Sequence, residues 1–192
     1  MYQNVVYRFL EAHHTHAYAG RGGDNMHNTV FPFVDSWSHH KTIADMLRAI
    51  SFPEVRLNAG AVVLAEGDFT TAFGSKKTGH FDVVVTHFFI DTARNFMSYL
   101  DIIFRVLKPG GGNWVNFGSL LYGNAPSVQL SLEEIVAVAQ AMGFVFLDVP
   151  EGCGAVSLPG TKVRGLEAAY GFDERALTRN AYDAQFWVAK RP

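Results

Sequence analysis

The sequence has little cysteine and no strong excess of charge of either sign. Cys153 is the only cysteine among 192 residues, which excludes an internal disulfide framework and favours a reducing compartment. The formal net charge is −2, so charge indicates neither nucleic acid nor an anionic membrane as a partner. No hydrophobic run approaches the roughly 18 residues of a membrane span, and the N-terminus lacks the cationic start of a secretory signal. We expect a soluble intracellular protein, cytoplasmic with the nucleus as a second compartment.

Common ligand-binding motifs are also missing. No GxGxxG sequence follows a strand and no Walker-type lysine is present, which disfavours another kind of nucleotide-using α/β enzyme. The glycine-rich run 20–24 has no strand before it and no helix directly after it, so we predict a loop over 15–29 rather than a phosphate cradle. Six histidines lie in the first 40 residues without a spacing typical of metal ligands, so we predict no metal site. They are His13, His14, His16, His27, His39 and His40.

Hydrophobic residues, in contrast, are plentiful. They make up 48% of the chain, enough for a substantial core, and no linker or repeat is evident, so we predict one domain over residues 1–192. Apolar spacing and turn residues predict helices over 4–14, 43–50 and 131–142, the last with a capping box of Ser131 and Glu134. Short apolar runs predict strands over 61–65, 144–149 and 185–189.

The segment 81–118 predicts a complete βαβ unit. Val83 to Ile90 is almost continuously apolar, as in a parallel strand buried on both faces, and Asp91 and Thr92 stop it and can cap a helix. The helix has apolar residues at helical spacing from Phe96 to Leu107, and a second strand follows over 113–117. Together with the other strands this predicts an α/β fold, a three-layer sandwich. Since ligands bind beyond the carboxyl ends of parallel strands, Asp91 is a candidate site residue.

Several blocks of the chain resemble the carnosine N-methyltransferase family, a branch of the class I S-adenosylmethionine-dependent methyltransferases. They include FPFVDSWSHHKTIADMLRAISFPEV (31–55), FDVVVTHFFIDTARN (81–95), LKPGGGNWVNFGSLLYG (107–123) and AYDAQFWVAKRP (181–192). LKPGG occurs in many methyltransferases, whereas FFIDTA followed by NxGxLLY is more specific. The resemblance implies an enzyme with S-adenosyl-L-methionine as cofactor that methylates the imidazole of carnosine, or of a related dipeptide, to give anserine.

The resemblance also implies roles for five residues. Asp91 matches the family's carnosine-binding aspartate and is our catalytic candidate, and Tyr182 is a second substrate-binding candidate. Asp68, Phe69 and His87 match cofactor-binding positions. A structural role stays open for three of them: Asp68 and Asp91 as helix N-caps, and Tyr182 as a strand aromatic packed on the core. The expected partner is a small dipeptide, with no nucleic acid and no membrane.

Two features depart from the family. Its loop GPLLYH ends in a histidine that contacts the imidazole, and Gly123 stands at that position, with His80 and Asn124 as candidate substitutes. The class also begins with two strands and a Gly-rich turn that the resemblance puts before Met1. We therefore expect a partial class I (Rossmann-like) sheet lacking the first two strands of the order 3-2-1-4-5-7-6, either with a gap or with strand 61–65 paired to strand 83–90. The alternative function is a non-catalytic, truncated methyltransferase-like remnant or interaction subunit.

Overall fold

The computed structural model describes residues 27–34, 40–53, 60–73, 77–123, 127–170 and 173–192. The chain forms two compact units, Met1–Val62 and Val63–Pro192, and each is described by itself. The predicted helix over 4–14 and most of the predicted loop over 15–29 lie outside the described residues.

The first unit contains a small antiparallel sheet of β1 (His27–Val30) and β2 (Ile50–Pro53). The helix α2 (Ile43–Met46) lies between them in sequence and is only four residues long. The predicted helix over 43–50 is therefore wrong in its second half, where Ile50 pairs with Val30. The predicted loop is likewise wrong at 27–29. Both errors have one cause. The two segments form strands because their backbones hydrogen-bond to each other, and the local sequence pattern of either segment does not show this pairing.

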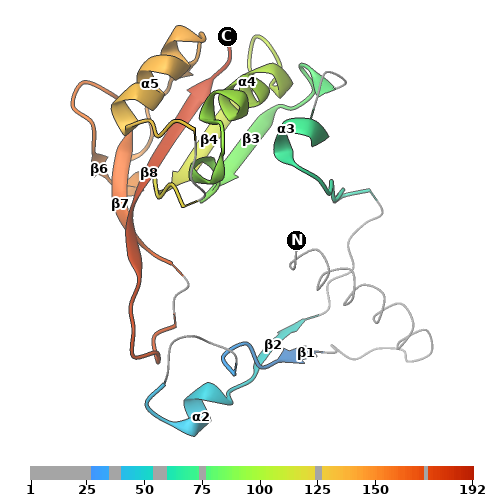
Figure 1. The fold of residues 1–192 in the computed structure, drawn as a ribbon, viewed down its shortest axis with the longest axis vertical. Helices are drawn as coiled ribbons and strands as arrows, with labels where there is room; N and C mark the ends of the chain where they lie inside the picture. The colour runs from blue at the N-terminus through green and yellow to red at the C-terminus, as the bar shows by residue number, and fades with distance from the viewer. Residues whose placement is uncertain (1–26, 35–39, 54–59, 74–76, 124–126, 171–172) are drawn as a thin grey trace. The chain divides into compact units, whose positions relative to one another are not determined.

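The second unit has an α/β fold, in which helices accompany a sheet of parallel and antiparallel strand pairs. Its strands run in the order β3-β4-β8-β7-β6, and β5 also pairs with β8 (Figure 1). The strands are β3 (Val83–His87), β4 (Asn113–Gly118), β5 (Val145–Phe146), β6 (Ala155–Val156), β7 (Arg164–Ala169) and β8 (Ala181–Lys190). The helices are α3 (Phe69–Ala72), α4 (Phe96–Val106) and α5 (Leu132–Ala141), with 3-10 turns η2 (Ile90–Thr92) and η3 (Glu151–Cys153).

The predicted βαβ unit is confirmed, since β3 and β4 are parallel neighbours joined through α4. Its boundaries differ from the prediction in two places. The strand ends at His87 because Phe88 adopts a positive φ of 45°. The N-cap of α4 is Asn95, whose side chain accepts the Ser98 N–H at 3.4 Å, whereas Asp91 lies in η2. The early end of β3 therefore leaves room for a 3-10 turn that carries Asp91.

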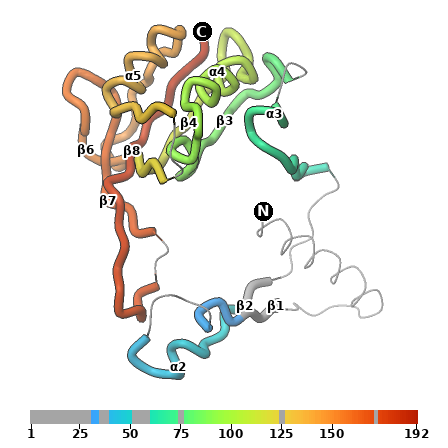
Figure 2. Tube along the Cα trace, in the orientation of Figure 1, coloured from blue at the N-terminus to red at the C-terminus, as the bar shows by residue number. Residues whose placement is uncertain are grey.

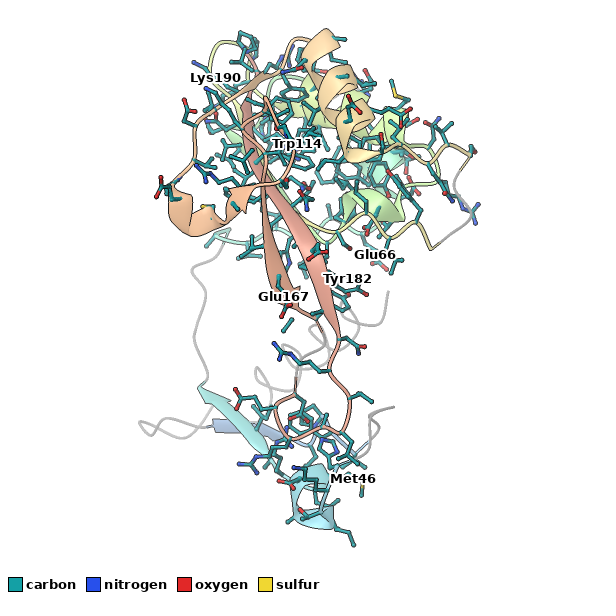
Figure 3. The ribbon with its side chains drawn as sticks, turned by 90° about the vertical axis from the view of Figure 1, so that its left-hand side faces the viewer. Met46, Glu66, Trp114, Glu167, Tyr182 and Lys190 are labelled. Carbon is teal, nitrogen blue, oxygen red and sulfur yellow. The ribbon has the colours of Figure 1, made fainter. Side chains whose placement is uncertain are left out.

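The core of this unit lies on one face of the sheet, under α4 and α5 (Figure 1). Trp114 and Trp187, from neighbouring strands, are almost fully buried and meet edge to face with ring centroids 5.2 Å apart. Figure 3 shows Trp114 among the densely packed side chains of this region. Leu100 and Ile103 contribute the apolar face of α4, as its helical spacing predicts. Within the described ranges, α4 and α5 cover one face of the sheet, and the third layer of the sandwich stays a prediction.

The prediction that the strand from Val83 is buried on both faces is wrong. Val83 is 49% exposed and Val85 is 65% exposed on the face opposite the helices. In the described part of the chain, no strand pairs with the outer edge of β3, which is therefore an edge strand. The predicted strand over 61–65 is not formed, and Val63 in that run is 82% exposed. An apolar run shows that a segment could be buried, but burial also requires a partner.

The C-terminal strands differ in length from the prediction. The predicted strand over 144–149 shrinks to β5, while the one over 185–189 extends to the ten residues of β8. Strand β7 was not predicted, because Gly165, Ala168 and Ala169 have weak strand propensity and join the sheet through pairing with β8 and, for Gly165, also with β6. The register of β4 with β8 ends at Gly118 opposite Gln185. Residues 181–184 therefore pair with β7 alone among the described strands, as a two-stranded ribbon (Figure 2).

The predicted capping box of α5 is confirmed. Glu134 Oε2 accepts the Ser131 N–H at 2.7 Å, and the Ser131 hydroxyl accepts the Glu134 N–H at 3.3 Å. The bonds from the Ser131 backbone and side chain lower the pKa of Glu134 below its ordinary value of 4.5. The stabilisation from the ionised carboxylate is thus fully present above pH 4.5 and is lost as the pH falls through the lowered value.

We therefore expect a Glu134→Gln variant to be less stable than the wild type at neutral pH and equally stable in acid. Glutamine keeps the length of the side chain and can cap the helix, so the comparison isolates the charge. Urea unfolding of both proteins at several pH values from neutral to about pH 3 measures the difference. A difference that stays the same at every pH would contradict this role of the carboxylate.

Candidate functional site

The candidate site lies where β3 and β4 end together. Asp91 is in η2, shortly after β3, and only 7% of it is exposed. The Ser119 hydroxyl donates to Asp91 Oδ2 at 3.2 Å, and the Leu121 N–H donates to the same oxygen at 2.9 Å. Both donors belong to the loop that follows β4. The parallel pairing of β3 and β4 thus brings a carboxylate and two donors together at the carboxyl edge of the sheet.

The two loops at this edge are also joined through their backbones. The Phe88 N–H donates to the Phe117 carbonyl at 2.8 Å, and the Ser127 N–H donates to the Arg94 carbonyl at 2.9 Å. The Tyr122 hydroxyl donates to the Leu130 carbonyl at 2.7 Å, which holds the loop from its other end. Burial raises the pKa of Tyr122, and the negative charge of Asp91 raises it further, so this phenol stays protonated as a donor.

The second carboxylate oxygen of Asp91 accepts from neither of these donors. Among the described residues, every hydrogen bond to Asp91 falls on Oδ2, and Oδ1 has no partner. Because Oδ1 is not one of the fully buried atoms without a partner, a group from outside the chain can reach it. Oδ1 is therefore suited to accept an N–H from a ligand.

Aromatic rings gather beside the end of β3. His87, the exposed last residue of the strand, stacks on Phe117 with centroids 5.7 Å apart and meets Phe88 edge to face at 5.0 Å. The backbone of Phe88 comes so close to Gly118 that a Cβ at position 118 would lie 2.9 Å from the Phe88 Cα and N. Glycine is therefore required at the end of β4 for this turn to form.

Tyr182 joins the same aromatic group from the ribbon of β7 and β8. Its ring lies 5.8 Å from Phe88 and 5.1 Å from Tyr170, and Figure 3 shows it on the part of β8 away from Trp114. Tyr182 thus packs on rings outside the core cluster, which differs from the packing on the core that was left open for it. Its predicted role in substrate binding stays a prediction, as does the predicted contact of His87 with a cofactor.

Asp68 and Phe69 lie at the start of α3. Asp68 is its N-cap: the carboxylate accepts the Thr70 N–H at 2.8 Å and also the Thr70 hydroxyl. These bonds, that of the hydroxyl first, lower the pKa of this exposed carboxylate. The ring of Phe69 packs edge to face on Phe89 at 5.2 Å and on Tyr99 at 5.0 Å. Phe69 is therefore linked to the segment that leads into Asp91, while the cofactor roles of both residues stay predictions.

Two residues, His80 and Asn124, were candidates to replace the family's histidine at position 123. His80 precedes β3 and Asp91 follows it, so a strand of five residues at roughly 3.3 Å each separates them. His80 therefore cannot replace a histidine at position 123 in this site. Asn124 lies outside the described residues. Ser119 was not singled out from the sequence, although its place directly after a predicted parallel strand was a usable signal.

No group of three or more histidine, cysteine, aspartate or glutamate side chains in the described ranges could hold a metal ion. Most of the N-terminal histidines fall outside those ranges. None of the helices that the structure describes is long and apolar enough to cross a membrane.

These features define a mixed α/β protein with an acidic site at the carboxyl edge of a parallel strand pair. A family model for carnosine N-methyltransferase matches residues 21–192. The carnosine N-methyltransferase of Rattus norvegicus is 39% identical over 172 residues, which are 85% of this chain and 39% of that protein. That of Schizosaccharomyces pombe is 30% identical over 181 residues, 84% of this chain and 44% of that protein. The chain belongs to the carnosine N-methyltransferase family.

The chain spans about two fifths of the length of these curated relatives. Among solved structures, the CurJ carbon methyltransferase matches 60% of this chain and 30% of its own, with 17% identity and a TM-score of 0.37.

Proposed function

We propose that this protein is an S-adenosylmethionine-dependent N-methyltransferase that acts on the imidazole of carnosine, or of a related histidine-containing dipeptide, to give anserine. Membership of the family supports the reaction class. We further propose that its sheet is part of a class I methyltransferase sheet in a three-layer sandwich. In that sheet, β3, β4 and β8 would be the strands that follow the first two. The open outer edge of β3 among the described strands supports this reading.

The buried carboxylate of Asp91 is the observation that carries the proposal. Its Oδ2 is held by two donors from the chain itself, and its Oδ1 is left for a donor from outside. A dipeptide such as carnosine offers amine, amide and imidazole N–H groups. Asp91 accepts one of them and thereby holds the imidazole in a fixed orientation for the reaction, which is a positioning role. The aromatic rings near Phe88, including Tyr182, offer a surface for a flat imidazole ring.

The residues at the start of α3 fit the cofactor that the family implies. The exposed, ionised carboxylate of Asp68 can accept an exocyclic amine, and the Phe69 N–H, at the first position of the helix, has no partner among the described residues. These two groups would hold an adenine, with His87 lining the site from β3. When bound, S-adenosylmethionine supplies an electrophilic methyl group.

Gly123 favours a second candidate function. It provides no side chain to accept the proton that leaves the imidazole, in a loop where the family carries a histidine. A non-catalytic, methyltransferase-like subunit would keep the fold and Asp91 while lacking that group.

A direct assay separates the two candidates. The chain is incubated with S-adenosylmethionine carrying a labelled methyl group, at millimolar concentration, and with carnosine or with a dipeptide whose histidine is replaced by phenylalanine. We expect label in the first dipeptide only, in a product that elutes with anserine. Calorimetry with the cofactor alone supplies the second measurement. If neither labelled anserine nor cofactor binding is detected, the enzymatic proposal fails and the non-catalytic function replaces it.

A further inference from the structure

Ser119 occupies a special place beside Asp91. It directly follows Gly118, the last residue of β4, and is 8% exposed. Its hydroxyl lies 3.2 Å from Asp91 Oδ2 and donates to it. The contact crosses 28 positions in sequence, from the loop after one parallel strand to the turn after its neighbour. It is thus a consequence of the sheet pairing and not of local chain geometry.

Two donors on one oxygen restrain the carboxylate more than one donor does. The terminal torsion of an aspartate side chain is broad and roughly two-fold, so a single bond from the Leu121 N–H permits the carboxylate to turn about that contact. A second donor on the same oxygen restrains this rotation further. Oδ1 then has one defined direction in which it can accept a hydrogen bond. The entropy of fixing the carboxylate is lost when the chain folds, so ligand binding does not have to include that loss.

The loop that carries these donors is itself held on both sides. Phe88 and Phe117 are joined by a backbone hydrogen bond of 2.8 Å just before the two loops diverge. The Tyr122 hydroxyl fixes the far side of the loop on the Leu130 carbonyl at 2.7 Å. The Ser119 hydroxyl therefore approaches Asp91 from a rigid frame, and its removal should loosen the carboxylate without displacing the loop.

We propose that Ser119 is a positioning residue that orients the Asp91 carboxylate so that Oδ1 faces the substrate. Its role in the reaction rests on the proposed function, because Asp91 is there assigned to the dipeptide. The residue acts through Asp91 and does not touch the reacting atoms. The role requires the hydrogen bond that the hydroxyl donates, and it does not depend on the size of the side chain.

A matched pair of variants isolates the hydroxyl. Ser119→Thr keeps it and adds a methyl group, whereas Ser119→Val has nearly the same shape as threonine without the oxygen. We expect Ser119→Val to raise the KM for carnosine about tenfold, the equivalent of one charge-assisted hydrogen bond. Ser119→Thr should stay within about threefold of the wild type, and the Kd for S-adenosylmethionine should be unchanged in both. If both variants raise KM equally, or if only their stability changes, Ser119 is a structural residue and the proposal is overturned.

A second measurement does not depend on catalysis. The unfolding of the wild type, Ser119→Val, Asp91→Ala and the double variant forms a double-mutant cycle. The proposal expects the two substitutions to be non-additive, because each removes the same contact. Additive effects would overturn the orienting contact whether or not the chain is active. Non-additive effects in a protein that transfers no methyl group would support the orienting contact, while the proposed function alone would fail.

Discussion

An Asp91→Ala variant is expected to methylate carnosine about 10²- to 10³-fold more slowly than the wild type at subsaturating dipeptide. Truncating one partner of a buried, charged hydrogen bond typically costs about 2–5 kcal/mol, and each 1.4 kcal/mol is roughly a factor of ten. Asp91 is 7% exposed, and Oδ1 is its only oxygen without a donor among the described residues. A ligand N–H that pairs with it therefore meets a largely buried carboxylate. The measurement is kcat/KM for carnosine with labelled cofactor.

The matched control is Asp91→Asn, which keeps the shape of the side chain. The donors of Ser119 and Leu121 require an oxygen on the inner side, so the amide must turn its NH₂ group toward the substrate. A donor then replaces the acceptor, and we expect nearly the same loss of activity as with alanine. The Leu121 N–H keeps its partner in this variant, so its stability should be closer to that of the wild type.

Cofactor affinity distinguishes the two possible assignments of Asp91. We expect the Kd for S-adenosylmethionine to be nearly unchanged in both variants, because the cofactor candidates lie at the start of α3 and at His87. A large loss of cofactor binding with unchanged circular dichroism would assign Asp91 to the cofactor instead. Full activity of Asp91→Asn would remove Asp91 from the reaction altogether.

The parts of the fold that could be predicted are those that depend on local pattern. The helical spacing from Phe96, the capping box at Ser131 and the apolar runs of β3 and β4 all lie within single segments. The parts that could not be predicted depend on partners. Strand β7 exists through its pairing with β8, and the run 61–65 stays unpaired in the described chain although its residues favour a strand. Propensity alone does not decide pairing.

The candidate site was predictable to a similar extent. Asp91 could be located because the edge rule for parallel sheets needs only the strand boundary. The contacts of Ser119 and the close approach of Phe88 to Gly118 depend on how two loops meet in space, 28 to 30 positions apart in sequence. The resemblance could suggest Tyr182 as a site residue, but only the register of β8 brings it to Phe88.

A Gly123→His variant is expected to methylate carnosine on the order of 10² times faster than the wild type, since a positioned general base contributes about 10²- to 10⁴-fold. The position can accept the side chain. A Cβ at residue 123 would meet no atom within 4 Å, its φ is not in the left-handed region, and the residue is exposed. It directly follows Tyr122, which closes the loop that donates to Asp91. The imidazole introduced at position 123 would therefore lie at the edge of the site.

The pH dependence and a control variant show whether the gain comes from a base. An exposed histidine titrates near pH 6.5, so the gain should be present above about that pH and disappear below it, where the ring is protonated and cannot accept a proton. Gly123→Gln introduces a side chain of similar size and the same loss of glycine flexibility without a group that titrates there. We expect it to leave the rate unchanged. An equal gain with glutamine, or a gain that is constant from pH 5 to about pH 8, would mean that the loop and not a base limits the rate of methyl transfer.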